Sequence, residues 1–283
     1  MAHALTWLDV FTDRPLTGNG LAVVHDADGL DDATMLAFAR ETRLSETTFV
    51  QTATEAGADY RNRIWMTQRE LPFAGHPSLG TAVAVARARG DRATTYVQQT
   101  TAGLQPIEVE MGERVAHASM LQEPAAFGAE LDPADVLPAL GLAASDAAGE
   151  LAPQVVGTGI DHLMVPVREA AALDRVAPDA AALRPLLDGS GCVCAYVAFL
   201  DADRESAAAR GFFLDGASVL EDPATGSAAG PLMAYAHART GAARLTIEQG
   251  VAMGRASRLV CSAGERVRVA GDAVVVFETT VDL

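Results

Sequence analysis

Two proline-opened turns rich in small residues, one in each half of the chain, constrain the fold more than any other feature. The first runs from Glu70 to Gly80 and the second from Glu221 to Gly230. Each carries a titratable side chain, His76 or Asp222, directly before a proline. Proline followed by small residues is typical of a helix start, where open backbone N–H groups favour an anion. The two turns lie 146 positions apart (222 minus 76) in a chain of 283 residues, which indicates a duplicated fold with one composite site.

A second pair of motifs supports the duplication. A glycine turn at Thr17-Gly18-Asn19 has a counterpart at Gly157-Thr158-Gly159, with an offset of 141 (158 minus 17). Similar offsets in the same order indicate a tandem repeat of about half the chain. The Ala- and Pro-rich stretch over residues 124–153 gives the boundary. The prediction is an N-terminal half over 1–125 and a C-terminal half over 126–283, with the terminal strand able to pack back on the first half.

Charge and composition exclude several classes of partner. The chain has 21 Lys and Arg against 37 Asp and Glu, a formal charge of -16, and such a field repels phosphate backbones and anionic lipids. We therefore expect no nucleic acid and no membrane partner, although a small anionic substrate remains compatible because local helix starts can outweigh net charge. No basic N-terminal region or apolar run of about 20 residues predicts a signal peptide or a membrane span, so we expect a cytoplasmic protein.

The cysteines and histidines predict no metal site. The three cysteines form no CxxC pair, and the six histidines are scattered. We expect all three cysteines in the core, and no metal. The sequence also has no GxGxxG after a strand, no Walker loop, no GxSxG elbow and no HExxH, so we expect no cofactor.

Local patterns predict mixed strands and helices rather than an open doubly wound sheet. Acidic residues followed by helical apolar spacing predict a helix over 31–40, and an apolar helix follows over 77–88. Strands are predicted over 6–11, 21–24, 47–52, 61–66, 258–261, 267–269 and 274–277. Pro231 leaves two alternatives: either the second helix kinks there, or residues 225–230 form a loop and the helix begins at Pro231.

Three side chains are candidates for proton transfer. His76 and Asp222 could each simply terminate or begin a helix, but the pairing of the two turns favours a functional role. Glu46 lies between a predicted helix and strand; it is either a solvated loop carboxylate or a general acid/base whose pKa is raised by partial burial. A histidine, two carboxylates, a serine and open backbone amides, without a cofactor motif, favour proton transfer at carbon.

The motifs together resemble the PhzF-like family, named for the isomerase of phenazine biosynthesis. The matching segments, in family order, are 9–12 with 18–19, 44–49, 70–80, 157–159 with 162–163, 221–228, and 249–250 with 253–255. The resemblance implies an α+β, diaminopimelate epimerase-like fold with two pseudo-symmetric domains, each a curved β barrel around a central helix, and a site in the cleft between them. It also implies a homodimer and no cofactor.

The resemblance implies roles for individual residues. Glu46 would be the main acid/base, moving a proton from one ring carbon to another, as in isomerisation of trans-2,3-dihydro-3-hydroxyanthranilate. His76 and Asp222 would orient the substrate and help relay or stabilise charge. The residues expected to contact polar groups of the substrate are Gly75, Gly226 and Ser227. Epimerase relatives carry a cysteine pair in these turns, where this chain has Ala74 and Thr225.

Departures from the family pattern leave the substrate open. Gly20 and Ala256 stand where the family often has proline, and Trp65-Met66 replaces the more usual Phe-Thr near the site. The first hypothesis is therefore an isomerase acting on a small cyclic amino or hydroxy acid. The alternatives are an epimerase or racemase that uses Glu46 in place of thiols, and a non-catalytic dimer that binds a small molecule.

Overall fold

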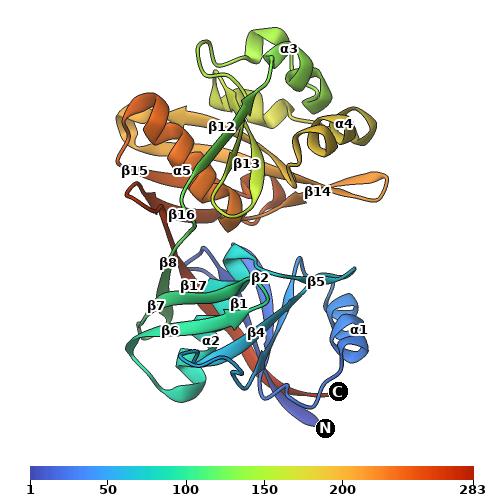
Figure 1. The fold of residues 1–283 in the computed structure, drawn as a ribbon, viewed down its shortest axis with the longest axis vertical. Helices are drawn as coiled ribbons and strands as arrows, with labels where there is room; N and C mark the ends of the chain where they lie inside the picture. Colours follow the sequence, from blue (N-terminus) through green and yellow to red (C-terminus); the bar gives the residue numbers. More distant parts are fainter. The chain divides into compact units, whose positions relative to one another are not determined.

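The chain forms two compact units (Figure 1). The computed structural model describes residues 1–283, apart from the side chain of residue 202. Unit 1 contains Met1–Leu121 and Ala270–Leu283, and unit 2 contains Gln122–Val269. The division at residue 121 lies four positions before the 125/126 boundary proposed from the sequence (125 minus 121). The last strand, β17 (Arg268–Asp282), has residues in both units, and it replaces the two strands predicted over 267–269 and 274–277.

Unit 1 surrounds one central helix with strands. Its elements are β1 (Ala2–Val10), β2 (Asn19–Val24), α1 (Asp32–Thr42), β3 (Thr47–Gln51), β4 (Tyr60–Trp65), β5 (Glu70–Leu71), α2 (Gly75–Arg89), β6 (Ala93–Thr100), β7 (Gly103–Met111) and β8 (Val115–Leu121). Helix α2 contacts β1, β2, β3, β4, β6, β7 and β8. Every residue from 75 to 86 is buried, which explains why its sequence is small or apolar nearly all round.

Unit 2 repeats this plan with additions. Its elements are β9 (Ala126–Glu130), α3 (Pro133–Val136), β10 (Gln154–Gly157), β11 (Asp161–Val167), α4 (Ala180–Ser190), β12 (Cys194–Asp201), β13 (Ser206–Asp215), β14 (Ser218–Asp222), α5 (Gly226–Thr240), β15 (Arg244–Gln249) and β16 (Ser257–Ser262). Short 3-10 turns occupy 137–140, 144–146, 170–175, 202–204 and 251–253. Helix α5 contacts β10, β11, β12, β15 and β16.

Pro231 lies inside α5, which begins five residues earlier, at Gly226. The alternative in which residues 225–230 form a loop is therefore wrong. Proline has no N–H, so it cannot close the usual bond to the carbonyl four positions before it, that of Ser227. The helix is nevertheless maintained, because ten of its residues are buried among the strands.

The two units share one strand order. In unit 1, β2 and β3 are parallel, β3 and β4 antiparallel, β4 and β5 antiparallel, and β4 and β6 parallel. In unit 2, the same four relations hold for β11 with β12, β12 with β13, β13 with β14, and β13 with β15. The central helix follows β5 in unit 1 and β14 in unit 2, directly before the last strand of each series. The duplication inferred from the sequence is therefore present in the topology.

The helix starts and the strand register give a different spacing between the two repeats from the one inferred from His76 and Asp222. Helices α2 and α5 each have 15 residues and start 151 positions apart (226 minus 75). The residue equivalent to His76 is therefore Ser227, and the 146-position spacing between His76 and Asp222 joins positions that are not equivalent. The strand pairings also make Ala22 of β2 equivalent to Leu163 of β11. This offset is 141 positions (163 minus 22), the same as the offset between the two glycine turns.

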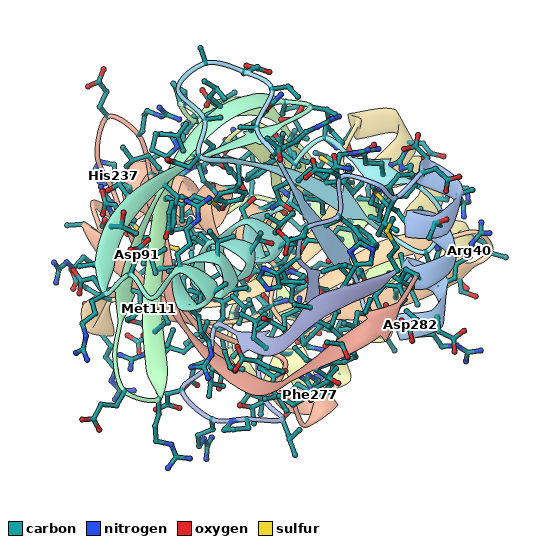
Figure 2. All side chains as sticks on the ribbon, turned by 90° about the horizontal axis from the view of Figure 1, so that it is seen from below. Arg40, Asp91, Met111, His237, Phe277 and Asp282 are labelled. Atoms are coloured by element: carbon teal, nitrogen blue, oxygen red, sulfur yellow. The ribbon has the colours of Figure 1, made fainter. Side chains whose placement is uncertain are left out.

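Each unit has its own apolar core. In unit 1 the core cluster includes Phe49 and Trp65, and in unit 2 it includes Leu163 and Phe212. In unit 1, Phe277 of β17 stacks on Trp7 of β1 with 5.5 Å between ring centroids, and Phe277 remains 45% exposed. Phe277 is labelled on its strand in Figure 2.

Candidate active site

The two central helices start differently from the others. The N-cap residues of helices α1, α3 and α4 are Asp31, Asp132 and Asp179, and each of these carboxylates accepts a hydrogen bond from a first-turn backbone N–H. The N-cap residues of helices α2 and α5 are Ala74 and Thr225, and neither makes a capping hydrogen bond with its side chain. Since an uncapped first turn presents N–H groups and the positive end of the helix dipole, both starts suit a negatively charged group.

The first half-site, in unit 1, brings together Glu46, His76 and Asn19. Glu46 directly precedes β3, His76 is the second residue of α2, and Asn19 is the first residue of β2. Oε2 of Glu46 lies 3.6 Å from Nε2 of His76, and Nδ2 of Asn19 lies 3.2 Å from Nδ1 of the same ring. The side chains of Glu46 and His76 are only 14% and 5% exposed. Glu46 is therefore partly buried, as an acid/base role requires, rather than a solvated loop carboxylate.

His76 is neutral near pH 7. Burial lowers its pKa from 6.5 to about 3, because a charged imidazolium loses its hydration in the core. A hydrogen bond between the ring and the backbone of Gly20 acts in the opposite direction, to raise the pKa, but burial has the larger effect. Asn19 and Gly20 together hold the imidazole, whose Nε2 faces Oε2 of Glu46.

Gly75 is held by the start of α2. It is buried directly after Ala74, and the hydroxyl of Ser78 donates to the carbonyl of Ala74 at 2.7 Å. Nε2 of the buried Gln98, in β6, in turn donates to the Ser78 hydroxyl at 2.7 Å. The first turn of α2 is thus fixed from inside the unit.

The second half-site, in unit 2, is built on the end of β14 and the start of α5. Asp222 is the last residue of β14, and its Oδ2 accepts a hydrogen bond from the hydroxyl of Thr225 at 2.7 Å. Gly226 and Ser227 are the first two residues of α5. The carbonyl of Gly226 accepts from the side-chain amide of Gln122 at 2.9 Å, which holds the first turn from outside the helix.

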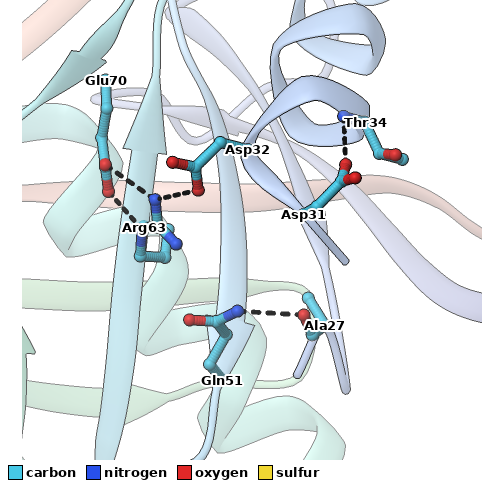
Figure 3. A network of polar contacts seen from close by, with 7 residues as sticks. All are labelled: Ala27, Asp31, Asp32, Thr34, Gln51, Arg63 and Glu70. Carbon is cyan, nitrogen blue, oxygen red and sulfur yellow. Dashed lines mark hydrogen bonds and ion pairs between the residues drawn. The ribbon is translucent and has the colours of Figure 1, made fainter. Parts of the chain in front are cut away.

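A buried arginine clamps the strand before each turn. In unit 1, Arg63 binds both carboxylate oxygens of Glu70 and also Asp32, and its guanidinium lies 5.6 Å from the centre of the Trp65 ring (Figure 3). The hydrogen bond to Glu70 is the main reason that the pKa of Arg63 is raised. Trp65, the departure from the family pattern, is 6% exposed and packs in the core beneath this clamp.

Unit 2 repeats the clamp with Arg210 and Glu221. The guanidinium donates to both carboxylate oxygens at 2.8 and 2.7 Å and to the carbonyls of Leu173 and Val176 at 2.7 and 3.0 Å. It lies 5.0 Å from the centre of the Phe212 ring. The register is the same in both units, since Trp65 pairs with Glu70 and Phe212 with Glu221.

None of the three thiols lies in either of the two turns. The three free cysteines are Cys192, Cys194 and Cys261, all buried, and burial raises the pKa of each. A thiolate is the reactive form, so these residues are poor nucleophiles or bases. Within the described part of the chain, no group of three or more His, Cys, Asp or Glu side chains is arranged to hold a metal ion.

The sequence did not identify the residues that hold the two turns. Asn19 and Gln249 lie in motifs that mark the family resemblance, but neither motif shows which side chain it contacts. Arg63 and Arg210 are single charged residues in strands and carry no local signal. Gly20, which stands where the family often has proline, lies within β2.

Comparison with known proteins agrees with this architecture. The sequence matches the family described as phenazine biosynthesis-like protein (PhzC-PhzF) over residues 8–279. The trans-2,3-dihydro-3-hydroxyanthranilate isomerase of Pseudomonas aeruginosa is 37% identical over 272 residues, covering 94% of this chain and 93% of the relative. A solved structure from the same organism, described as a predicted epimerase, superposes with a TM-score of 0.86 at 36% identity and covers 99% of both chains.

More distant structures identify the fold. A hydroxyproline epimerase from Agrobacterium vitis has a TM-score of 0.66 at 14% identity, covering 99% of this chain and 92% of the other. The fold is therefore diaminopimelate epimerase-like, as expected from the sequence. No helix among the described residues is long and apolar enough to cross a membrane. Three curated relatives from Pseudomonas species are named as isomerases, and the chain is an enzyme of this isomerase class. It belongs to the phenazine biosynthesis-like (PhzC-PhzF) protein family.

Proposed function

We propose that the protein is a cofactor-independent isomerase that moves a proton between two carbons of a small, anionic, cyclic amino or hydroxy acid. The observation that carries the proposal is the pair formed by the partly buried Glu46 and the buried, neutral His76, with 3.6 Å between Oε2 and Nε2. A relative 37% identical over nearly the whole chain is named trans-2,3-dihydro-3-hydroxyanthranilate isomerase, so that compound is the first substrate to test.

Glu46 is the proposed acid/base. As a carboxylate it takes a proton from one carbon, the electron pair moves into the adjoining unsaturated system, and the carboxylic acid returns the proton to another carbon. The neutral ring of His76, whose Nε2 lies 3.6 Å from Oε2 of Glu46, is proposed to orient the substrate and to help relay or stabilise charge. Positioned acid/base catalysis of this kind accelerates reactions by about 10² to 10⁴.

Residues of unit 2 are proposed to supply polar groups for the same reaction. Asp222 is proposed to orient the substrate and to help relay or stabilise charge. Gly75, Gly226 and Ser227 are proposed to contact its polar groups, because they form the uncapped first turns of α2 and α5. A carboxylate of the substrate is the anion that such a helix start would accept.

Incubation in deuterated water, followed by proton NMR, tests the proposal. We expect wild type to place deuterium on a new carbon and Glu46→Gln to abolish the exchange. Glu41→Gln removes an exposed carboxylate from α1 and serves as the matched control, with turnover as in wild type. Equal inertness of wild type and Glu46→Gln toward a broad panel of cyclic acids would contradict the proposed function.

Epimerisation is the second candidate, because a structural relative with 36% identity is described as an epimerase. Ala74 and Thr225 stand where epimerase relatives carry thiols, so Glu46 would have to serve in their place. The same NMR experiment separates the two reactions, since epimerisation exchanges the proton and inverts the configuration at a single carbon.

We also propose that the protein is a cytoplasmic homodimer. The family resemblance supports the dimer, and the three free cysteines support a reducing compartment. Light scattering on the purified protein would give twice the 29.4 kDa chain mass for a dimer. Fractionation of the host cell would test the location.

A further inference from the structure

A buried chain of hydrogen bonds lies beneath the second turn. Its members are Tyr196 of β12, Gln249 of β15, Thr225 and Asp222. Tyr196, Gln249 and Thr225 are at most 3% exposed. The tyrosine hydroxyl donates to Oε1 of Gln249 at 2.7 Å, and Nε2 of Gln249 lies 2.8 Å from the carbonyl of Asp222 and 2.9 Å from the hydroxyl of Thr225. The chain ends at Oδ2 of Asp222, 2.7 Å from that hydroxyl.

Backbone groups fix the orientation of Gln249. The N–H of Thr225, which can only donate, lies 3.0 Å from one end of the Gln249 side chain, so that end is the oxygen. The carbonyl of Asp222, which can only accept, lies at the other end, so that end is the NH₂ group. The amide cannot be turned over without breaking both contacts.

The orientation of Gln249 in turn fixes the proton of Thr225. Both protons of the Gln249 NH₂ group are donated, one to the Asp222 carbonyl and one to the Thr225 hydroxyl oxygen. The hydroxyl therefore accepts from Gln249, and its own single proton points to Oδ2 of Asp222. The side-chain contacts thus lead from Tyr196 through Gln249 and Thr225 to the carboxylate.

The hydrogen-bonded groups are packed closely against Gly211. A Cβ on Gly211 would lie 2.7 Å from the Thr225 hydroxyl oxygen and 3.3 Å from Nε2 of Gln249. Gly211 pairs with both Tyr196 and Asp222 in the sheet, so its missing side chain gives the hydrogen bonds their space. A contact under 3.0 Å would force the hydroxyl to move.

The first turn shows that the hydroxyl is not needed for folding. Thr225 is equivalent to Ala74, because both directly precede the first residue of their 15-residue helices. Asp222 is equivalent to Leu71 by the same 151-position offset (222 minus 71). The turn therefore forms in unit 1 without a hydroxyl, and the hydroxyl and the carboxylate occur together in unit 2.

We propose that Thr225 and Gln249 are positioning residues for Asp222, which hold Oδ2 as a hydrogen-bond acceptor and so fix the orientation of the carboxylate. The inference rests on the proposed role of Asp222. A hydrogen bond to a charged group contributes more than one between neutral groups, so a neutral donor fixed in this way holds one carboxylate orientation.

Three variants test the proposal by activity. Thr225→Ala introduces the residue of the first turn and is expected to lower kcat about tenfold with KM changed less than about threefold, since the loss is of orientation rather than binding. Thr225→Ser keeps the hydroxyl and should restore kcat to within about threefold of wild type. Ser257→Ala is the matched control, because Ser257 is buried and bonds to the carbonyl of Pro223 at 2.9 Å; it should turn over as wild type does.

A substrate-free measurement separates this proposal from the proposed function. The carboxyl carbon of Asp222 is observed by ¹³C NMR, with its resonance assigned by its loss in Asp222→Asn. We expect Thr225→Ala to shift that resonance and Thr225→Ser and Ser257→Ala to leave it in place. An unshifted resonance in Thr225→Ala, or a Thr225→Ser variant that behaves as Thr225→Ala does, overturns the proposal. Wild-type protein that turns over no cyclic acid contradicts the proposed function, while the NMR result still decides the positioning.

Discussion

The two half-sites have the same framework and different chemistry. Each has an Arg–Glu clamp on the preceding strand, a 15-residue central helix without a side-chain cap, and a buried glutamine 23 positions after the helix start (98 minus 75, and 249 minus 226). The titratable groups, however, occupy positions that are not equivalent. The residues that hold the turns in place are therefore shared by the two repeats, whereas the reactive residues have diverged.

The equivalent positions make the divergence concrete. The register of the strands aligns Glu46 with Cys194, and the helix starts align His76 with Ser227. Cys194 is fully buried, and burial raises the pKa of its thiol well above the ordinary value. The acid/base of unit 1 thus has an inert counterpart in unit 2, which predicts unequal roles for the two half-sites.

The largest expected effect is on catalysis. Glu46→Gln should lower kcat by about 10³, the middle of the range for a positioned acid/base, whereas Asp222→Asn should lower it by about tenfold to a hundredfold. Steady-state kinetics on the isomerisation substrate measure both. Cys194→Ala, at the position equivalent to Glu46, is the control and should keep kcat within about twofold. A larger loss in Asp222→Asn than in Glu46→Gln would reverse the assignment of the base.

Removing an Arg–Glu clamp should change the stability of the protein rather than its activity, and by a different amount in each unit. Arg63→Met and Arg210→Met each leave a largely buried glutamate without its arginine, at a cost of about 2 to 4 kcal/mol. Arg210→Met should cost more, because it also removes the donor to the carbonyls of Leu173 and Val176. Urea unfolding measures the difference. The double variant Arg63→Met with Glu70→Met should recover part of the loss, and equal losses in the two arginine variants would break the comparison.

Acid should destabilise both units through buried histidines, of which His76 in unit 1 and His162 in unit 2 have the lowest pKa values. Burial lowers the pKa of His76 and of His162 from 6.5 to about 3. Between these values the unfolded chain binds protons that the folded protein excludes, so stability falls as the pH falls. The loss is about 2 kcal/mol per histidine between pH 6.5 and 5.

His162→Leu tests the acid effect in unit 2, because leucine is the residue at the equivalent position of unit 1, Leu21. The variant should lose about 2 kcal/mol less stability than wild type between pH 6.5 and 5, as measured by urea unfolding at the two pH values. His237→Gln changes an exposed histidine of α5 and should leave the pH dependence unaltered. A wild-type slope in His162→Leu would mean that this imidazole does not control it.

Local sequence patterns predict the turns and central helices of the duplicated fold, but they do not predict the contacts that orient the side chains of the site. The second turn and the core helix over 77–88 were predictable because proline, small residues and apolar spacing are local signals; the structure extends that helix to Gly75–Arg89. The Arg63–Glu70 clamp depends on the register of β4 and β5. The hydrogen bond from Gln249 to the carbonyl of Asp222 joins residues that are 27 positions apart (249 minus 222). Nothing local encodes either contact. The repeat spacing was misjudged for the same reason, since His76 and Asp222 look alike in sequence but occupy different positions of the turn.

The smallest expected effect is on stability at the ends of the two central helices, and it should be the same in both units. The C-cap residues that follow helices α2 and α5 are Gly90 and Gly241, and both have φ of 76°. A Cβ added at either glycine would have no neighbouring atom within 4 Å, so it meets only the backbone penalty of the left-handed conformation. Gly90→Ala and Gly241→Ala should each cost about 1 kcal/mol, which urea unfolding of the two variants measures. Since the end of the helix belongs to the duplicated frame and not to the chemistry, the two values should agree, and a clear difference would show that the frames have diverged as well.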